Sequence, residues 1–475
     1  MSGHKAGGYV EMQDEERRER KSLYIILQPH PGPVLILTKA GHVPVLGGLG
    51  FQHDSADALN AKRGFAAELY EVSKILDEKI INDPPDLDDL SAADYEQTLD
   101  EVLTLTEGQS LLALDSLREL GRGLRDKLDK GLVTELKRHG FPQDDRSKEP
   151  ALTFANDKQA PVLWEMMYEE EQPGEDVDWQ HFWGFRIPIT HWEATTRPDK
   201  ILLKKGLFSG IDQTLDFANS EVTFLAQQLK AGLQHRSLSD AFREQVNKEL
   251  CKQMQDNAQV EAWFASQDAG SWLNCFLLQV LIQGINEAAL AEHKTRRWKE
   301  QTIRSIFNDP HFAYELIHFA CHCEPSDISE LLTKLSINIA GEEISLNVAS
   351  MANDREWGPE DPGPLVFLNA CGTGAQGDTT EPPGFPENWI KHRGALAVIA
   401  TLCPVPDLFA HAFALKFYSI LFRAATDPQA PVRHRYLGEA LMETRRHFME
   451  KCKNPLGLAY VLYAVKDAYI ENPVN

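Results

Sequence analysis

The sequence predicts an α/β fold built around a mainly parallel sheet. Two short apolar runs, Leu316–His322 and Leu365–Gly372, have the length of a strand and lack the polar alternation of a half-exposed one. Helical patterns follow the strand-like runs, among them Phe217–Leu229, Leu408–Phe422 and Gly438–Cys452. Buried strands that alternate with amphipathic helices are typical of α/β proteins.

Each of the two apolar runs ends in a reactive side chain. His322 closes the first run, and Cys371 stands near the end of the second, 49 positions later. That interval suits one crossover helix, predicted over Asp327–Leu335, and the next parallel strand. Because the carboxyl ends of neighbouring parallel strands meet at one edge of a sheet, we expect the imidazole and the thiol to share a crevice. A cysteine nucleophile with a histidine base requires this pairing.

Two other interpretations of these residues stay open. A single cysteine in an apolar run is usually a small buried hydrophobe, which is the expectation for Cys321, and His318 is expected to be a packed, hydrogen-bonded structural histidine. Alternatively, His318, Cys321, His322 and Cys323 could bind zinc. No second Cys-x-x-Cys pair or acidic ligand cluster completes a tetrahedral set, so no metal site is predicted.

The residues around this pair resemble a known family. The runs ending Phe319-Ala320-Cys321-His322 and Leu368-Asn369-Ala370-Cys371 resemble the CHAT family, caspase-like cysteine peptidases of the caspase and separase clan. The interval matches the caspase rule of a histidine about 50 residues before the cysteine. The resemblance covers about residue 105 to the C-terminus and includes residues 163–167, 394–402, 403–407, 438–441 and 460–467.

The chain departs from the family pattern at three places. Cys323 stands where the family usually has glycine, and Cys403 stands where it usually has tryptophan. A long stretch, expected to form a helical insertion over residues 230–308, separates the first core strand from the histidine strand. The substitution at Cys323 bears on the oxyanion hole, and the insertion suggests an added regulatory or docking element.

The resemblance implies a regulated cysteine endopeptidase that makes limited cuts in a protein substrate. Cys371 would be the nucleophile, His322 the general base and acid, and the backbone N–H groups of Cys371 and Cys323 the oxyanion hole. No cofactor is expected. The resemblance further implies an activating or inhibiting protein partner and a setting in bacterial antiviral defence or programmed cell death. The competing interpretation is a noncatalytic interaction module that keeps a caspase-like fold.

Asp407 is the candidate for substrate binding. It follows the strand-like run that ends at Thr401, and in the separase branch of the clan an acid in the corresponding turn receives a basic P1 side chain. A buried carboxylate pairs well with a guanidinium group, in a bidentate arrangement. Asp407 also immediately precedes the helical pattern of Leu408–Phe422, so a helix N-cap is an equally good interpretation.

The bulk properties exclude some classes of function. The 475 residues include 48 basic and 71 acidic side chains, for a net charge of −23, which argues against direct nucleic-acid binding. Seven scattered cysteines predict a reducing compartment and no disulfide framework. No secretory signal or apolar stretch of membrane-spanning length is visible, so a cytoplasmic protein without membrane contact is expected.

The chain is expected to divide into three parts. Residues 1–21 should form a disordered tail, and residues 22–150 an N-terminal segment with a strand hairpin followed by helices. Residues 151–475 should form a caspase-like three-layer α/β/α sandwich, the peptidase core. Within it, Phe185–Ile189 is predicted as an edge strand and Ile201–Ser209 as the first parallel strand, after a polar connector over Gln143–Lys158.

Overall fold

The computed structural model describes most of the chain between residues 22 and 471. The predicted tail at residues 1–21, residues 254–300 of the predicted insertion, and Cys371 lie outside the described residues. The described residues are 22–26, 34–38, 45–46, 55–87, 90–126, 128, 130–138, 141, 150–155, 162–169, 176–192, 200–202, 206–228, 234–253, 301–309, 312, 314–324, 334–339, 342–347, 363–370, 384–427, 429–465 and 467–471.

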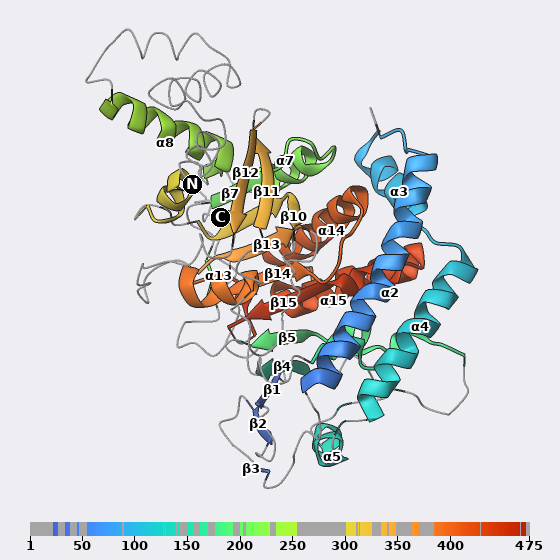
Figure 1. The fold of residues 1–475 in the computed structure, drawn as a ribbon. Helices are drawn as coiled ribbons and strands as arrows, with labels where there is room; N and C mark the ends of the chain where they lie inside the picture. Colours follow the sequence, from blue (N-terminus) through green and yellow to red (C-terminus); the bar gives the residue numbers. More distant parts are fainter. Residues whose placement is uncertain are drawn as a thin grey trace, which may run out of the picture.

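One large sheet organises the fold (Figure 1). Its strands are β1 (Ser22–Ile26), β2 (Val34–Thr38), β3 (Val45–Leu46), β4 (Ala151–Ala155), β5 (Ile189–Trp192), β7 (Gly206–Ile211), β8 (Gln234–Ser237), β9 (Leu316–Ala320), β13 (Leu365–Asn369), β14 (Ala397–Thr401) and β15 (Tyr460–Ala464). Among the described residues the order is β3-β2-β1-β4-β5-β15-β14-β13-β9-β7-β8. Most neighbours run parallel, and the antiparallel pairs are β1–β2, β2–β3 and β14–β15. The predicted α/β class with a mainly parallel sheet is confirmed.

The central strands are buried along their whole length. Every residue of β9, β13, β14 and β15 is buried, which explains why these segments read as unbroken apolar runs. Both faces of such a strand must therefore be covered by other elements.

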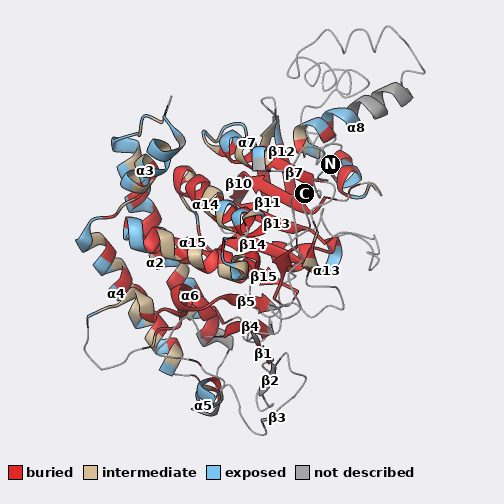
Figure 2. Cartoon of the chain, turned by 180° about the vertical axis from the view of Figure 1, so that it is seen from behind, coloured by how far each residue is buried: buried red, intermediate tan, exposed pale blue. Residues whose placement is uncertain are grey.

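Helices cover the sheet on both faces, and Figure 2 shows the buried residues concentrated between them. His318 of β9 contacts Tyr418 on one face, whereas the next residue, Phe319, contacts Trp389 on the other. Because successive strand residues point to opposite faces, these contacts define the expected three layers. The helices are α2 (Ser55–Asn82), α3 (Ala92–Val102), α4 (Glu107–Asp126), α5 (Lys130–Arg138), α6 (Trp183–Arg186), α7 (Ala218–Gln228), α8 (Leu238–Gln253), α13 (Phe385–Arg393), α14 (Asp407–Thr426) and α15 (Leu437–Cys452).

The N-terminal segment is joined to the core sheet and to its helices. The predicted hairpin is confirmed, because β1 pairs antiparallel with β2, and β1 also pairs parallel with β4. Between α3 and α4, the Leu105 N–H donates to the Cys452 carbonyl at 2.9 Å, and Asn454 Nδ2 donates to the Leu103 carbonyl at 3.0 Å. Helix α2 also packs against α4 and against a short 3₁₀ turn at Pro455–Ala459.

A second, small sheet lies where the sequence predicted a crossover helix. It consists of β10 (His322–Glu324), β11 (Lys334–Ile339) and β12 (Glu342–Asn347), all paired antiparallel. The helix predicted over Asp327–Leu335 is therefore wrong at Lys334 and Leu335, which belong to β11. Residues 325–333 lie outside the described residues. The physical reason is the spacing of the apolar residues. Leu335 and Ile337 are buried and alternate with more polar positions, which is the two-residue period of a strand.

Three other sequence predictions need correction. Phe185 lies in α6, and the nearby strand is β5, which lies between β4 and β15 rather than at an edge. The predicted connector over Gln143–Lys158 contains β4, whose alternation of Leu152 and Phe154 is too short to stand out. The insertion over residues 230–308 begins with β8, a polar strand at the end of the described sheet, where polar residues are tolerated.

Candidate active site

The ends of β9 and β13 lie level with each other at one edge of the sheet. Ala320 is the register partner of Asn369, and the Cys321 N–H donates to the Asn369 carbonyl at 3.4 Å. His322 follows Ala320 by two residues, and Cys371 follows Asn369 by two residues. Cys371 itself lies outside the described residues, and Ala370 is the last described residue before it.

A cavity of about 280 Å³ opens at this edge. His322, the first residue of β10, is exposed and lines it together with Cys321, Asn369 and Ala370. The structure therefore brings the predicted base and the residue that precedes the predicted nucleophile to the same cavity. Cys321 is buried, as expected, but it also faces this cavity.

Two further elements form most of the remaining cavity wall, which Leu215 also lines. One is the turn before α14, with Pro404, Val405 and Pro406 leading to Asp407. The other is a stripe of α2 whose residues are spaced at i, i+3, i+4 and i+7, the period of one helix face. The members of this α2 stripe are Tyr70, Ser73, Lys74 and Asp77.

Asp407 is the first residue of α14, and Pro406 is the N-cap residue of that helix. The Asp407 carboxylate accepts a hydrogen bond from the Phe217 N–H at 3.2 Å, at the start of α7. It therefore binds the N-terminal turn of a neighbouring helix rather than capping its own. Burial raises the pKa of the Asp407 carboxyl from 3.8 to about 6; the Phe217 N–H opposes this rise, and nearby Glu221 and Asp216 add to it.

His318 is a structural histidine, as the sequence predicts. Its side chain is fully buried, with Nε2 2.7 Å from Glu221 Oε2 and Nδ1 3.3 Å from the Tyr418 hydroxyl. Both ring nitrogens are therefore engaged, which leaves neither free for a metal. Among the described residues, no group of three or more histidine, cysteine or acidic side chains is placed to hold a metal ion.

Glu221 is a site residue that sequence reasoning missed. It is 1% exposed, and both its carboxylate oxygens accept hydrogen bonds from Asn369 Nδ2, at 3.1 and 3.0 Å. A signal was present, because Glu221 occupies a core position of the buried stripe formed by Ala218, Val222 and Leu225. A carboxylate at such a position needs a partner.

Two hydroxyl groups that sequence reasoning also missed hold the end of β13. The Tyr460 hydroxyl donates to Asn369 Oδ1 at 2.8 Å, and Thr401 Oγ1 donates to the Ala370 carbonyl at 2.6 Å. Neither contact leaves a local sequence signal, because β14 and β15 meet β13 only through the tertiary fold.

Cys323, the residue predicted to contribute an oxyanion-hole N–H, is buried in β10 opposite Leu335. It lies one residue after His322 on the strand that borders the cavity. Because Cys371 lies outside the described residues, the pairing of the two N–H groups stays a prediction.

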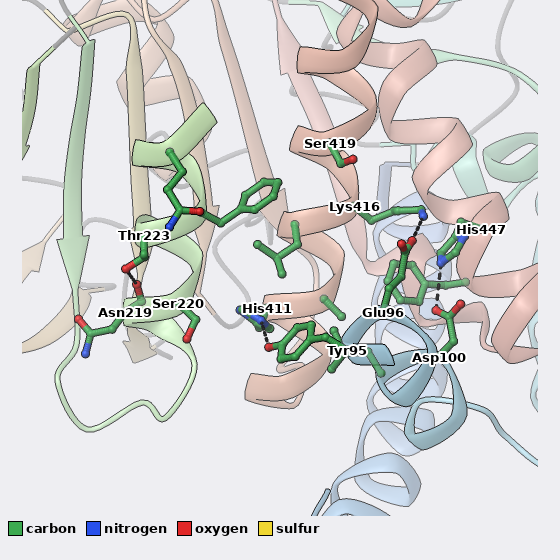
Figure 3. A pocket seen from close by; sticks show the side chains of 16 residues that line it. Tyr95, Glu96, Asp100, Asn219, Ser220, Thr223, His411, Lys416, Ser419 and His447 are labelled. Atoms are coloured by element: carbon green, nitrogen blue, oxygen red, sulfur yellow. Dashed lines mark hydrogen bonds and ion pairs between the residues drawn. The ribbon is translucent and has the colours of Figure 1, made fainter. Parts of the chain in front are cut away.

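A larger cavity of about 530 Å³ lies elsewhere, between α3, α7 and α14 (Figure 3). Two of its histidines are already bound: His411 Nε2 lies 2.8 Å from the Tyr95 hydroxyl, and His447 Nε2 lies 3.0 Å from Asp100. No cysteine occurs among the described residues that line it. The described lining of the larger cavity therefore offers no thiol for the predicted chemistry.

Among the helices that the structure describes, one is long and apolar enough to cross a membrane. This stretch, Asp407–Ala425 of α14, is 72% buried inside the protein. Helix α14 packs against α7 and α15, so its apolar composition fits a core helix.

One known protein is similar to part of this chain. A protein of Vitiosangium sp. (strain GDMCC 1.1324), named as a probable protease, is 27% identical over 117 residues, which are 25% of this chain and 14% of that protein. The chain thus matches only a small part of the length of that relative.

Two solved structures match this chain with low similarity. The complex of the pro- and mature domains of Porphyromonas gingivalis RgpB has a TM-score of 0.37 and 11% identity, covering 75% of this chain and 73% of that one. The Arg specific cysteine proteinase gingipain R has a TM-score of 0.35 and 11% identity, with coverages of 78% and 77%.

The model of the CHAT domain family matches residues 141–456, somewhat less than the span over which the motifs suggested a resemblance. The match contains β9 and β13, whose ends form the candidate site, and it covers well over half of the chain. This chain belongs to the CHAT domain family.

Proposed function

We propose that this protein is a cysteine endopeptidase with Cys371 as nucleophile and His322 as general base. The observation that carries the proposal is that Ala320 and Asn369 are register partners on neighbouring parallel strands. His322 follows Ala320 by two residues, and Cys371 follows Asn369 by two residues. His322 and Ala370 line one cavity, so a thiol attached to the next residue would start from the same edge. Membership of the CHAT family and the relative named as a probable protease support peptide-bond hydrolysis.

The chemistry would run in two displacements. The Cys371 thiolate attacks the scissile carbonyl carbon, and the carbonyl electron pair moves onto the oxygen. His322, having taken the thiol proton, gives it to the leaving amine as the C–N bond breaks and a thioester forms. Water then attacks the thioester with His322 as base, which releases the acid and the thiol.

The oxyanion of each tetrahedral intermediate needs hydrogen-bond donors. The N–H groups of Cys371 and Cys323 are the proposed pair, and loss of one such donor typically costs about 10²–10³ in rate. Because the donors are backbone groups, a cysteine in place of the usual glycine at position 323 can supply the same N–H.

Asp407 is proposed to receive a basic P1 side chain. Its carboxylate lines the same cavity as His322, and an arginine or lysine there would stabilise the ionised form. The hydrogen bond from the Phe217 N–H uses Oδ2, and each carboxylate oxygen can accept more than one donor.

Active-site labelling tests the proposed nucleophile. The full-length protein is incubated with an acyloxymethyl ketone peptide that carries P1 arginine, and the labelled residue is identified by mass spectrometry. We expect modification of Cys371 that is lost in His322→Ala. Cys321→Ser is the matched control, because Cys321 faces the same cavity and its loss should leave labelling unchanged. Labelling that persists in His322→Ala, or that moves to Cys321, contradicts the proposal.

A peptide library then tests the specificity. With P1 varied, arginine and lysine should be cleaved fastest, and Asp407→Asn should remove that preference. The competing proposal, a noncatalytic interaction module, predicts no cleavage with or without candidate protein partners.

A further inference from the structure

The carboxylate of Glu221 is bound on two sides by elements of the candidate active site. It accepts a hydrogen bond from His318 on β9 and from Asn369 on β13, the two strands whose ends carry the proposed dyad. Glu221 and His318 are at most 1% exposed, and Asn369 is 5% exposed. A carboxylate buried to this degree is stable only when its partners stay in place.

Asn369 has no rotational freedom in this arrangement. Its Nδ2 donates to Glu221, and its Oδ1 accepts from the Tyr460 hydroxyl at 2.8 Å. A flip of the amide would place oxygen against the carboxylate and nitrogen against the hydroxyl hydrogen. The network therefore fixes the side-chain orientation of Asn369 as well as its position.

The backbone beyond Asn369 is held in the same way. The Asn369 carbonyl accepts from the Cys321 N–H, and the Ala370 carbonyl accepts from Thr401 Oγ1. The next residue in the chain is Cys371. The backbone just before the nucleophile is thus held by Cys321 and Thr401, and the Asn369 side chain is held by Glu221 from α7.

We propose that Glu221 is a positioning residue, which acts through Asn369 to hold the end of β13, two residues before Cys371 in the chain. This inference rests on the proposed peptidase function and adds a residue from outside the reacting groups. Glu221 does not itself line the cavity, but it binds Asn369, which does, so we expect its effect on the site to pass mainly through Asn369.

Glu221→Gln is the informative substitution. Glutamine keeps the shape of glutamate but has one acceptor oxygen and one donor NH₂ group, so it presents a donor to either His318 or Asn369. Because a displacement of about 1 Å at a catalytic group can cost about 100-fold, we expect kcat to fall between about tenfold and about 100-fold. KM should stay within about twofold for a peptide with an uncharged P1 residue; a charged P1 residue is avoided because Glu221 also acts on the pKa of Asp407, the proposed P1 partner.

The chain offers a matched control in a second buried Glu–His pair. Glu165 is fully buried, and its Oε2 lies 2.8 Å from His191 Nε2, on β5 in the other half of the sheet. Neither residue lines the candidate active-site cavity. Glu165→Gln should lower the melting temperature at least as much as Glu221→Gln does, but leave kcat close to the wild-type value.

The experiment combines kinetics with a double-mutant cycle. Wild type, Glu221→Gln, Asn369→Ala, the double variant and Glu165→Gln are compared for kcat, KM, melting temperature and the rate at which iodoacetamide alkylates Cys371. Action through Asn369 predicts that the double variant is no slower than Asn369→Ala. The alkylation rate should fall in Glu221→Gln and not in Glu165→Gln.

Several outcomes overturn the inference. One is that the losses of kcat in Glu221→Gln and Asn369→Ala add up in the double variant. Another is that kcat falls no more in Glu221→Gln than in Glu165→Gln. A third is that Glu221→Gln keeps the wild-type kcat and the wild-type alkylation rate. A wild-type protein that cleaves no peptide refutes the proposed function instead. In that case the alkylation rates still decide whether Glu221 positions the thiol.

Discussion

Ala320 of β9 and Asn369 of β13 are direct register partners in a parallel pair. Residues level on neighbouring strands lie about 4.8 Å apart, so this pair defines a common starting line for the two segments that follow it. His322 and Cys371 both stand two residues beyond that line. Whether the two side chains lie close together can therefore be tested without any substrate.

A cross-link measures this closeness directly. His322→Cys, made in a Cys321→Ser/Cys323→Ser background, should form a disulfide with Cys371 on mild oxidation, because the Cα separation that a disulfide needs is about 4.4–6.8 Å. Peptide mapping identifies the linked pair. The same background with His322 retained is the control and should show no link to Cys371. Free thiols at both positions after oxidation would mean that the two segments diverge.

The raised pKa of Asp407 predicts a pH-dependent specificity. Because its pKa is about 6, Asp407 is ionised at pH 8 and mostly protonated at pH 5. The ratio of kcat/KM for a P1 arginine peptide to that for its neutral norleucine analogue should therefore fall by about tenfold as pH falls from 8 to 5. Asp407→Asn should give a low ratio that does not change with pH. A wild-type ratio that is equally flat rules out Asp407 as the P1 partner.

The same pKa makes a separate prediction for stability. A folded-state pKa of about 6 above the ordinary 3.8 means that ionising Asp407 opposes folding. The cost is absent below about pH 3.8, grows up to about pH 6 and is complete above it. Asp407→Asn should therefore raise the melting temperature at pH 8 by about 2 °C or more relative to its effect at pH 4. Equal effects at both values contradict the assignment.

The residues of the candidate site differ in how much of their placement could be predicted. The strands of β9 and β13 follow from unbroken apolar runs, and the rule that parallel strand ends meet brings His322 to the right edge. The same rule predicts Asp407 near this edge, because Asp407 follows the strand-like run that ends at Thr401. Its hydrogen bond to Phe217 could not be predicted, since the two residues are 190 positions apart.

The missed residues share one physical property. Glu221 and Tyr460 reach β13 from elements distant in the chain, and such contacts depend on how helices and strands pack rather than on local pattern. The short antiparallel strand β11 was missed because its first residues, Lys334 and Leu335, also continue a helical pattern. Tertiary pairing with β12 decided between the two.

Thr401 provides a prediction about the backbone before the nucleophile. Thr401→Val removes the donor to the Ala370 carbonyl and should cost about 1–2 kcal/mol of unfolding free energy. It should also lower kcat, by about tenfold, because Ala370 directly precedes Cys371. The matched variant is Thr444→Val, whose buried hydroxyl donates to the Ala440 carbonyl within α15. It should lose similar stability and keep its activity; equal kcat values for the two variants contradict the prediction.

The α2 stripe predicts that a helix outside the family match controls access to the site. Ser73 is 4% exposed and faces the cavity, so Ser73→Trp should place an indole ring in the space of about 280 Å³ beside His322. We expect kcat/KM for peptides to fall between about tenfold and about 100-fold, mainly through KM. Alkylation of Cys371 by iodoacetamide, a much smaller reagent, should fall far less.

The control lies on the same helix. Ile81 is 70% exposed and does not line the cavity, so Ile81→Trp adds the same ring to α2 without entering the site. Thermal unfolding of both variants separates blocked access from lost folding, since a folded Ser73→Trp should melt within a few degrees of wild type. If folded Ser73→Trp cleaves peptides as fast as Ile81→Trp, the prediction that α2 controls access to the site is wrong.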